Sequence, residues 1–319
     1  MQLNFAQIQP YDLARDGRAL VDLWQQALGD MWPLNGKRMQ KVLTGPYARH
    51  FVLYEDDALV GFVATSQSVK EQARIGHLAA LLVAPRKQRQ GIGTVLHEAA
   101  LAYLRAAGCI TLRLGATSPR FWCGVPTDLP SAVSFFRQRG WEYTETVYDL
   151  AADIHDFTIP APITERMRRE GIVFESVTAR NYNDVLAFET REFPHWLPHY
   201  ERYAQLGDYA DLLTARDQRR SVVGALILYS PQSHTARTDL IWQALLGEEA
   251  GAMGAVGAAQ SERGRGIGLA LVAYGSATLK ERGVRNCYID WVVLTDFYAR
   301  LGYEKWRAYY LSSERYTDS

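Results

Sequence analysis

The feature that most constrains this chain is a repeat within its 319 residues, in which two glycine loops have nearly the same spelling. They read Gln88-x-x-Gly91-x-Gly93 and Arg263-x-x-Gly266-x-Gly268. Gly91 and Gly266 are 175 positions apart, and so are Gly108 and Gly283, which end the helix-like runs after the two loops. Glycine is the usual residue just past a helix C-terminus, so these two helices are expected to have equal length. The spacing predicts one structural unit that occurs twice.

The strands and helices around the loops are also expected in two copies. They lie at 15–28, 50–54, 57–66, 78–85, 109–115 and 135–141 in the first copy, and at 181–193, 209–216, 221–229, 251–258, 286–293 and 297–303 in the second. The last helices carry F-F-R-Q-R-G-W and F-Y-A-R-L-G-Y, and their glycines, Gly140 and Gly302, are only 162 positions apart. The first copy therefore has 13 extra residues, which lie within 116–132.

The repeat predicts an α/β fold in two domains, 1–150 and 171–319. Residues 151–170 contain two prolines and are expected to form a linker with a short helix. Because a tandem repeat can imitate a homodimer within one chain, a monomer is the expected oligomeric state.

Composition excludes several classes of protein. Lys+Arg and Asp+Glu both number 35, and a net charge of zero gives no electrostatic basis for binding nucleic acid or an anionic membrane. The three cysteines fit neither a disulfide framework nor a metal site, so no metal is expected. No uncharged apolar run approaches the roughly 20 residues of a membrane helix, and the first ten residues lack a signal-peptide pattern. The cytoplasm is therefore the expected location.

A strand that ends in a glycine-rich turn and opens a helix is typical of an anion site. The first N–H groups of the helix have no intrahelical acceptor, and the helix dipole adds positive potential there. The spacing matches neither the dinucleotide fingerprint nor the Walker loop. The two loops therefore predict binding of a different pyrophosphate.

On these residues the sequence resembles the GNAT acetyltransferase superfamily in a tandem arrangement. The first copy matches the cofactor motif as L-L-V-A-P-R-K-Q-R-Q-G-I-G (81–93), and the second as V-G-A-A-Q-S-E-R-G-R-G-I-G (256–268), with Gln260 where the family often has proline. The resemblance implies two GNAT-like domains, each a mixed, mostly antiparallel sheet flanked by helices, and acetyl-CoA as the acyl donor. It implies cofactor contacts at Leu81, Val83, Gln88, Arg89, Gln90, Gly91, Ile92, Gly93 and Thr94, and at Val256, Ala258, Arg263, Gly264, Arg265, Gly266, Ile267, Gly268 and Leu269.

The resemblance also implies an acyltransferase that transfers the acetyl group directly to an amine in a ternary complex. In the family a tyrosine at the start of the last helix often protonates the leaving thiolate. Tyr298 stands there in the second copy, whereas the first copy has Phe136, which cannot donate a proton. The second domain is therefore favoured as the catalytic one. Glu249, with Glu248 beside it, is a candidate base, and a solvated turn in L-G-E-E-A-G is the alternative interpretation.

The acceptor is expected to be the amine of a small molecule. In the family the segment between the first two helices forms a wall of the acceptor site, and here it is rich in aromatic residues and histidine. The acceptor candidates are His195, Trp196, His199, Tyr200 and Asp290. Packed aromatic residues and an outward strand residue would explain them as well.

Two alternatives remain open at this stage. The chain could bind acyl-CoA without turnover, as a sensor, or catalysis could reside in the first domain with another proton donor. Cys123, in the extra residues of the first copy, is expected to be a bystander, and Cys109 and Cys287 are expected to be small core residues.

Overall fold

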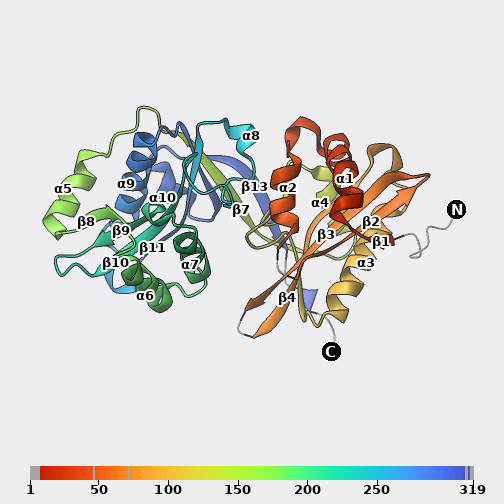
Figure 1. The fold of residues 1–319 in the computed structure, drawn as a ribbon, viewed down its shortest axis with the longest axis horizontal. Coiled ribbons are helices and arrows are strands. Elements are labelled where there is room, and N and C mark those ends of the chain that lie inside the picture. The colour runs from red at the N-terminus through yellow and green to blue at the C-terminus, as the bar shows by residue number, and fades with distance from the viewer. Residues whose placement is uncertain (1–7, 46, 71, 313–314, 317–319) are drawn as a thin grey trace. The chain divides into compact units, whose positions relative to one another are not determined.

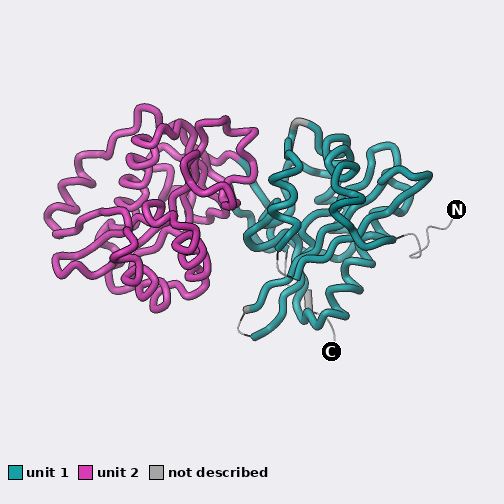
Figure 2. The backbone as a smooth tube through the Cα atoms, viewed as in Figure 1, with its two compact units in different colours: residues 1–147, 307–319 teal, residues 148–306 magenta. Residues whose placement is uncertain are grey.

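A computed structural model describes residues 8–45, 47–70, 72–312 and 315–316. The chain divides into two compact units, unit 1 (residues 1–147 and 307–319) and unit 2 (residues 148–306), which Figure 2 colours separately. Residues 1–7, which carry most of the signal-peptide expectation, lie outside the described residues. No helix in the part of the chain that the structure describes has both the length and the apolar character to cross a membrane.

Unit 1 repeats the order of elements expected for one copy. Its elements are β1 (Ile8–Pro10), α1 (Leu13–Leu28), η2 (Gly29–Met31), α2 (Gly36–Leu43), β2 (Arg49–Glu55), β3 (Ala58–Lys70), β4 (Ala73–Val83), η3 (Pro85–Lys87), α3 (Ile92–Ala106), β5 (Thr111–Leu114), β6 (Val125–Pro126), α4 (Pro130–Arg137) and β14 (Arg315–Tyr316). Its main sheet has the order β1-β2-β3-β4-β5-β14 (Figure 1). Only the β4–β5 pair is parallel, so the sheet is mixed and mostly antiparallel, as expected.

Unit 2 follows the same plan. Its elements are α5 (Ala161–Glu170), β8 (Val173–Ser176), α6 (Tyr182–Glu192), α7 (Leu197–Gln205), η4 (Tyr209–Asp211), β9 (Leu212–Arg216), β10 (Val222–Tyr229), α8 (Gln243–Leu246), β11 (Ala250–Ala258), η5 (Gln260–Glu262), α9 (Ile267–Glu281), β12 (Asn286–Val292) and α10 (Thr295–Ala299). The strand order is β7-β12-β11-β10-β9-β8, in which β7 spans Tyr143–Asp153, and only β11–β12 is parallel.

Two apolar clusters cover the two faces of this sheet. Leu226 and Leu228 of β10 pack with α9, which is buried along most of its length. Ala225 and Ile227, the alternate residues of the same strand, pack with α6 and α7. Because side chains alternate across a strand, α9 lies on one face and α6 and α7 lie on the other (Figure 1).

The compact units differ from the expected domains at both ends. The part of β7 from residue 148 belongs to unit 2, where it pairs with β12, and residues 307–319 belong to unit 1. There β13 (Glu304–Ser312) pairs with β6 through Tyr309 and Tyr310, and β14 pairs with β5. The expected linker 151–170 holds the end of β7 and all of α5. A strand pattern predicts a strand and does not specify the sheet that it joins.

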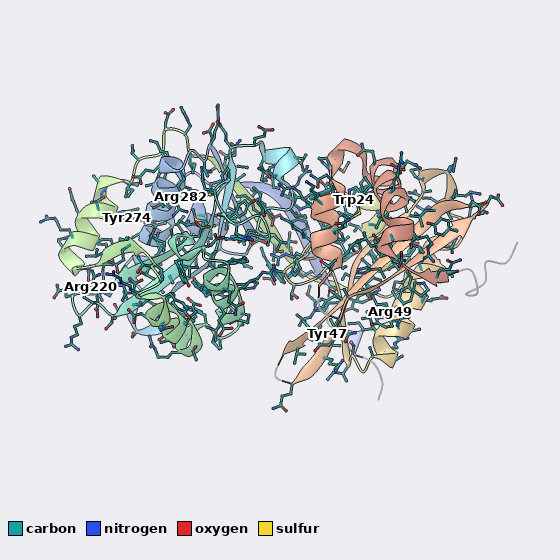
Figure 3. All side chains as sticks on the ribbon, viewed as in Figure 1. Trp24, Tyr47, Arg49, Arg220, Tyr274 and Arg282 are labelled. Atoms are coloured by element: carbon teal, nitrogen blue, oxygen red, sulfur yellow. The ribbon has the colours of Figure 1, made fainter. Side chains whose placement is uncertain are left out.

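The extra residues of the first copy fill the interior of unit 1. Phe121 and Trp122 are buried against Trp24 of α1, with ring centroids 4.9 and 5.4 Å apart, and Trp32 meets Trp122 edge to face (Figure 3 labels Trp24). Cys123 is buried beside them in the chain, and Cys109 and Cys287 are buried core residues, as expected. The segment is therefore part of the core of unit 1.

Candidate active site

The two glycine loops have the same backbone. In each, a strand ends in a three-residue 3-10 turn, and a glycine in the left-handed region caps a helix of 15 residues. The capping glycines are Gly91, with φ of 91°, and Gly266, with φ of 85°. Helices α3 and α9 begin 175 positions apart and have equal lengths, which confirms the predicted repeat.

Both loops have the features of an anion site. The N–H groups of the first helical turn, at 92–94 and 267–269, point out of the helix start without an intrahelical acceptor. The second glycine of each motif lies against the last helix of its unit. A Cβ added at Gly93 would come within 3.1 Å of Phe135, and one at Gly268 within 3.5 Å of Phe297. The loop and the last helix are thus held close together in both units.

The strand before each loop separates from its parallel neighbour. The pairing of β4 with β5 ends at Leu78, and that of β11 with β12 ends at Ala252. Each strand then continues to its loop, past Leu81 and Val83 in β4 and past Val256 and Ala258 in β11. Each strand also has a register shift in its antiparallel pairing on the opposite edge, next to Ala79 where β4 pairs with β3 and next to Ala255 where β11 pairs with β10. Ala255 has a φ of 49°. Such bulges bend a strand away from its partner, which leaves backbone groups for a ligand.

The side chains around the loops differ between the units. In unit 1, Arg139 donates to the hydroxyl of Thr94 and lies over the ring of Phe135, 3.6 Å from its centroid. Gln88 donates to the carbonyl oxygen of Val83 at the end of β4, and Gln90 donates to that of Arg86 in the loop. In unit 2, Arg265 is held by Glu170 and Glu262.

A residue of α5 also reaches the second loop. The Arg166 guanidinium donates to the carbonyl oxygen of Gly264 (2.7 Å), and a Cβ at Gly266 would come within 3.2 Å of it. Arg166 lies outside the glycine motif, which is why the motif did not identify it.

Tyr298 lies on α10, directly after the end of β12. It packs against the α9 cluster and beside Phe297 and Tyr303. Burial, and to a smaller extent the negative charge of Asp290, raise the pKa of Tyr298 to about 12. The phenol therefore keeps its proton at any physiological pH. In unit 1 the corresponding Phe136 is buried.

The structure does not bring Glu249 to Tyr298. Glu249 is exposed before β11, and its backbone carbonyl accepts from the N–H of Arg285, just before β12 begins. Tyr298 follows the other end of β12, and a strand of seven residues is about 20 Å long.

Four of the five acceptor candidates lie between the end of α6 and the first turn of α7: His195 and Trp196 precede α7, and His199 and Tyr200 are within it. Trp196 stacks on Phe193, with ring centroids 4.8 Å apart, and His195 is exposed beside it. Tyr200 is fully buried, and its hydroxyl donates to the carbonyl oxygen of Ala255 (3.1 Å). This segment therefore reaches the bulge of β11.

Glu189 of α6 is not among the site residues predicted from the sequence. It is fully buried, and burial raises the pKa of its carboxyl to about 8, although the nearby Tyr200 hydroxyl lowers it. The group is therefore largely protonated at neutral pH. The one feature of the sequence that could have indicated a buried carboxyl is that Glu189 lies on the apolar face of the helix expected at 181–193.

Residues 230–249, between β10 and β11, form a further structured segment that the repeat did not predict. Arg237 within it is buried and donates to Asp211 (2.6 Å), to Asp239 (2.7 Å) and to the carbonyl oxygen of Leu228 (2.7 Å). Its guanidinium lies 3.9 Å from the ring centroid of Tyr203. These contacts fix the segment to β10 and α7.

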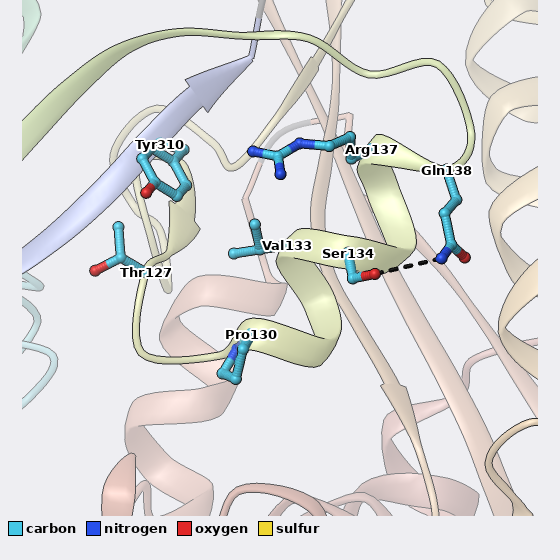
Figure 4. A pocket seen from close by; sticks show the side chains of 7 residues that line it. All are labelled: Thr127, Pro130, Val133, Ser134, Arg137, Gln138 and Tyr310. Atoms are coloured by element: carbon cyan, nitrogen blue, oxygen red, sulfur yellow. Dashed lines mark hydrogen bonds between the residues drawn. The ribbon is translucent and has the colours of Figure 1, made fainter.

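A cavity of about 370 Å³ in unit 1 lies elsewhere. As Figure 4 shows, residues of α4 and Tyr310 line it, and none of the predicted site residues is among them. Among the described residues, His, Cys, Asp and Glu side chains do not gather in a group that could hold a metal ion.

The chain thus contains two α/β units of one plan, each with a glycine loop that opens a helix beside a pair of parallel strands that separate. The profile of the Acetyltransferase (GNAT) family matches residues 17–141 and 180–305. The chain belongs to this family.

Several solved structures share this tandem fold. A region of a fungal multi-domain GH3 β-N-acetylglucosaminidase, described as a GCN5-related glucosamine N-acetyltransferase, is 40% identical, with a TM-score of 0.93. The match covers 97% of this chain and 38% of that one. A GCN5-related N-acetyltransferase from Sphaerobacter thermophilus is 18% identical, with a TM-score of 0.70 and coverage of 98% and 97%. A tandem GNAT protein from the clavulanic acid pathway is 16% identical, with a TM-score of 0.66 and coverage of 98% and 99%. No curated protein matches the chain.

Proposed function

We propose that this protein is an acetyl-CoA-dependent N-acetyltransferase that acts on the amine of a small molecule, with unit 2 as the catalytic unit. One observation carries the assignment to unit 2: of two loops with the same backbone, only the second has a phenol on the last helix of its unit, Tyr298 on α10, where α4 has Phe136. The loop amides would hold the pyrophosphate, and the free edge of β11 would hold the pantetheine arm.

The proposed reaction is a direct transfer. The neutral amine attacks the thioester carbonyl, an N–C bond forms, and the C–S bond breaks. Tyr298 gives its proton to the leaving thiolate and regains one from solvent, while the amine loses a proton to solvent. Because the pKa of Tyr298 is about 12, the phenol is in the donor form throughout the working range. Backbone N–H groups at the bulge of β11 are suited to stabilise the oxyanion.

We further propose an amino sugar as the acceptor. The support is the fungal region described as a glucosamine N-acetyltransferase, which is 40% identical over nearly this whole chain. His195, Trp196, His199 and Tyr200 would then form one wall of the acceptor site, because their segment reaches the β11 bulge. Glucosamine is the first acceptor to assay.

The test is acetyl-CoA binding by calorimetry, combined with glucosamine acetylation, for Gly266→Glu and Gly91→Glu. A carboxylate at Gly266 would repel the pyrophosphate, so we expect at least a hundredfold loss of affinity and loss of activity. The matched controls are Gly283→Glu and Gly108→Glu, which also have positive φ but end helices α9 and α3, with open space around a Cβ. They impose similar backbone strain away from the loops.

Several results of these measurements would contradict the proposal. If Gly91→Glu alone abolishes activity, catalysis resides in unit 1. If the wild-type protein binds acetyl-CoA but acetylates no amine, a non-catalytic acyl-CoA-binding protein is the better description. The intact backbone of the first loop favours a second candidate function for unit 1, which is acyl-CoA binding without transfer, and a second binding event lost in Gly91→Glu would support it.

A further inference from the structure

Strand β12 has an irregularity on the side where it pairs with β7. The register shifts between Ile289 and Val292, so that Asp290 and Trp291 both stand opposite Asp149. Two residues that face one are the pattern of a β-bulge, and bulges re-aim side chains next to active sites.

Asp149 binds this bulge with its side chain. One carboxylate oxygen accepts from the backbone N–H of Trp291 (3.1 Å), and the other accepts from the hydroxyl of Tyr288 (2.6 Å). Asp149 is 3% exposed. Burying a carboxylate is unfavourable unless donors satisfy it, and these two donors offset that cost while they tie β7 to β12.

Trp291 is held in an unusual conformation by these contacts. Its φ is 51°, in the left-handed region that bulky residues rarely adopt. Strain of this kind persists only where the surrounding structure maintains it, and it is concentrated at functional sites. The side chain is 37% exposed, which is unusual for so large an apolar group in a strand. The bulge therefore presents an indole ring to solvent.

The bulge lies beside the proposed reacting centre. It follows Tyr288, the last residue of β12 that pairs with β11, so it borders the separation of the two strands. The shifted register at Ala255 lies on the β11 side of the same separation. Asp290 is close enough to Tyr298 to raise its pKa. An acceptor at this bulge would be next to the proton donor.

We propose that Asp149 is a positioning residue for the acceptor, and that through the bulge it sets Trp291 and Asp290 to bind the ring and the ammonium group of an amino sugar. An amino sugar fits this pair, because the indole face attracts an adjacent ammonium group and packs on apolar C–H groups. The Asp290 carboxylate supplies a charge-assisted hydrogen bond. The inference rests on the proposed function. It gives a role in unit 2 to Asp149, which the repeat places in the first domain, 1–150.

The experiment is steady-state kinetics with glucosamine and acetyl-CoA for Asp149→Asn. Loss of the charged hydrogen bonds should raise the KM for glucosamine about tenfold and leave the KM for acetyl-CoA within about twofold. Calorimetry with glucosamine and CoA-saturated protein should show the same tenfold loss without any turnover. Asp153→Asn is the matched control. Asp153 is the last residue of β7, away from the bulge, and it accepts a hydrogen bond from the exposed Arg285. It should change neither KM.

A second variant keeps the test informative if Asp149→Asn proves unstable. Glycine accepts a φ of 51° without strain, so Trp291→Gly removes the indole and leaves the bulge. It should raise the KM for glucosamine about tenfold, and adding Asp149→Asn to it should raise that KM by clearly less than a further tenfold, because part of the effect of Asp149 is exerted through the same ring.

The outcomes separate the inference from the function on which it rests. Equal changes in both KM values, or independent and multiplicative effects of the two substitutions, would make Asp149 a purely structural residue and overturn the inference. An unchanged glucosamine KM in Trp291→Gly would overturn it as well. If the wild-type protein binds no acetyl-CoA and acetylates no amine, the proposed function fails first and the inference falls with it.

Discussion

Units 1 and 2 share a backbone at their glycine loops and differ in the side chains around them. Both helices begin at a left-handed glycine after a strand that leaves its parallel partner. In unit 1, Phe121 and Trp122 pack against Trp24 of α1, and Phe136 stands where unit 2 has Tyr298. In unit 2, Tyr298 follows the separated strands. The two units therefore share the backbone of the proposed anion site and differ in the side chains around it.

The largest expected effect is that of Tyr298→Phe, which tests whether the phenol distinguishes unit 2 from unit 1. Removing the phenol should lower kcat for glucosamine acetylation about a hundredfold, because the thiolate loses its proton donor. The affinity for acetyl-CoA should stay within about twofold, since the loop and strand are unchanged. Steady-state kinetics and calorimetry measure the two quantities.

The control is Tyr303→Phe, four residues from the last position of α10. Tyr303 is fully buried, and its hydroxyl is 2.8 Å from the hydroxyl of Ser276, so this variant should lose stability and keep kcat. An undiminished kcat in Tyr298→Phe would remove the chemical distinction between the two units.

The pH dependence of stability distinguishes the buried carboxyl groups of the two units. In unit 1, Asp16 is buried, but hydrogen bonds from Arg15, the Asp12 N–H and Tyr54 outweigh burial and lower its pKa. In unit 2, burial raises the pKa of Glu189 to about 8. The two groups therefore act on stability in opposite directions.

We expect Glu189→Gln to flatten the pH profile of unfolding. Folded Glu189 keeps a proton that the unfolded chain loses near its ordinary pKa of 4.5, so its stabilising effect is complete at low pH and is lost as pH rises to about 8. The wild-type free energy of unfolding should fall by up to about 1.4 kcal/mol per pH unit in that window. Urea unfolding at pH 5, 6, 7 and 8 measures it.

The control for this series is Glu201→Gln, which changes an exposed carboxylate on α7. It should keep the wild-type slope. If Glu189→Gln follows the wild-type profile at every pH, Glu189 is ionised in the folded protein and the contrast with Asp16 disappears.

The local structure of both units could be predicted from the sequence. Glycine at positions 91, 108, 266 and 283 marks helix starts and ends, and apolar runs mark strands, because these signals act over a few residues. Spacing and residue type then predict the two loops and Tyr298. Each of these inferences needs only neighbours in the chain.

The rest depends on contacts between distant residues. Asp149 bonds residues 139 and 142 positions away, and Arg166 bonds the carbonyl of Gly264, 98 positions away. No local pattern in the chain therefore indicated that β7 would contribute to the sheet of unit 2. Glu249 illustrates the same point. It is close in sequence to the strand before the second loop, but the fold places it about one strand length from Tyr298.

The smallest expected effect concerns Arg166, which α5 brings to the second loop. Arg166→Ala should weaken acetyl-CoA binding about three- to tenfold, because an exposed guanidinium adds a modest attraction to the pyrophosphate. The difference from wild type should shrink as salt rises from 50 to 500 mM, roughly the range over which screening becomes strong. Arg169→Ala, an exposed change on the same helix, is the control and should have no effect. Tighter binding in Arg166→Ala would mean that the guanidinium occupies the anion site and competes with the cofactor, so that α5 would make the second loop a weaker anion site than the first.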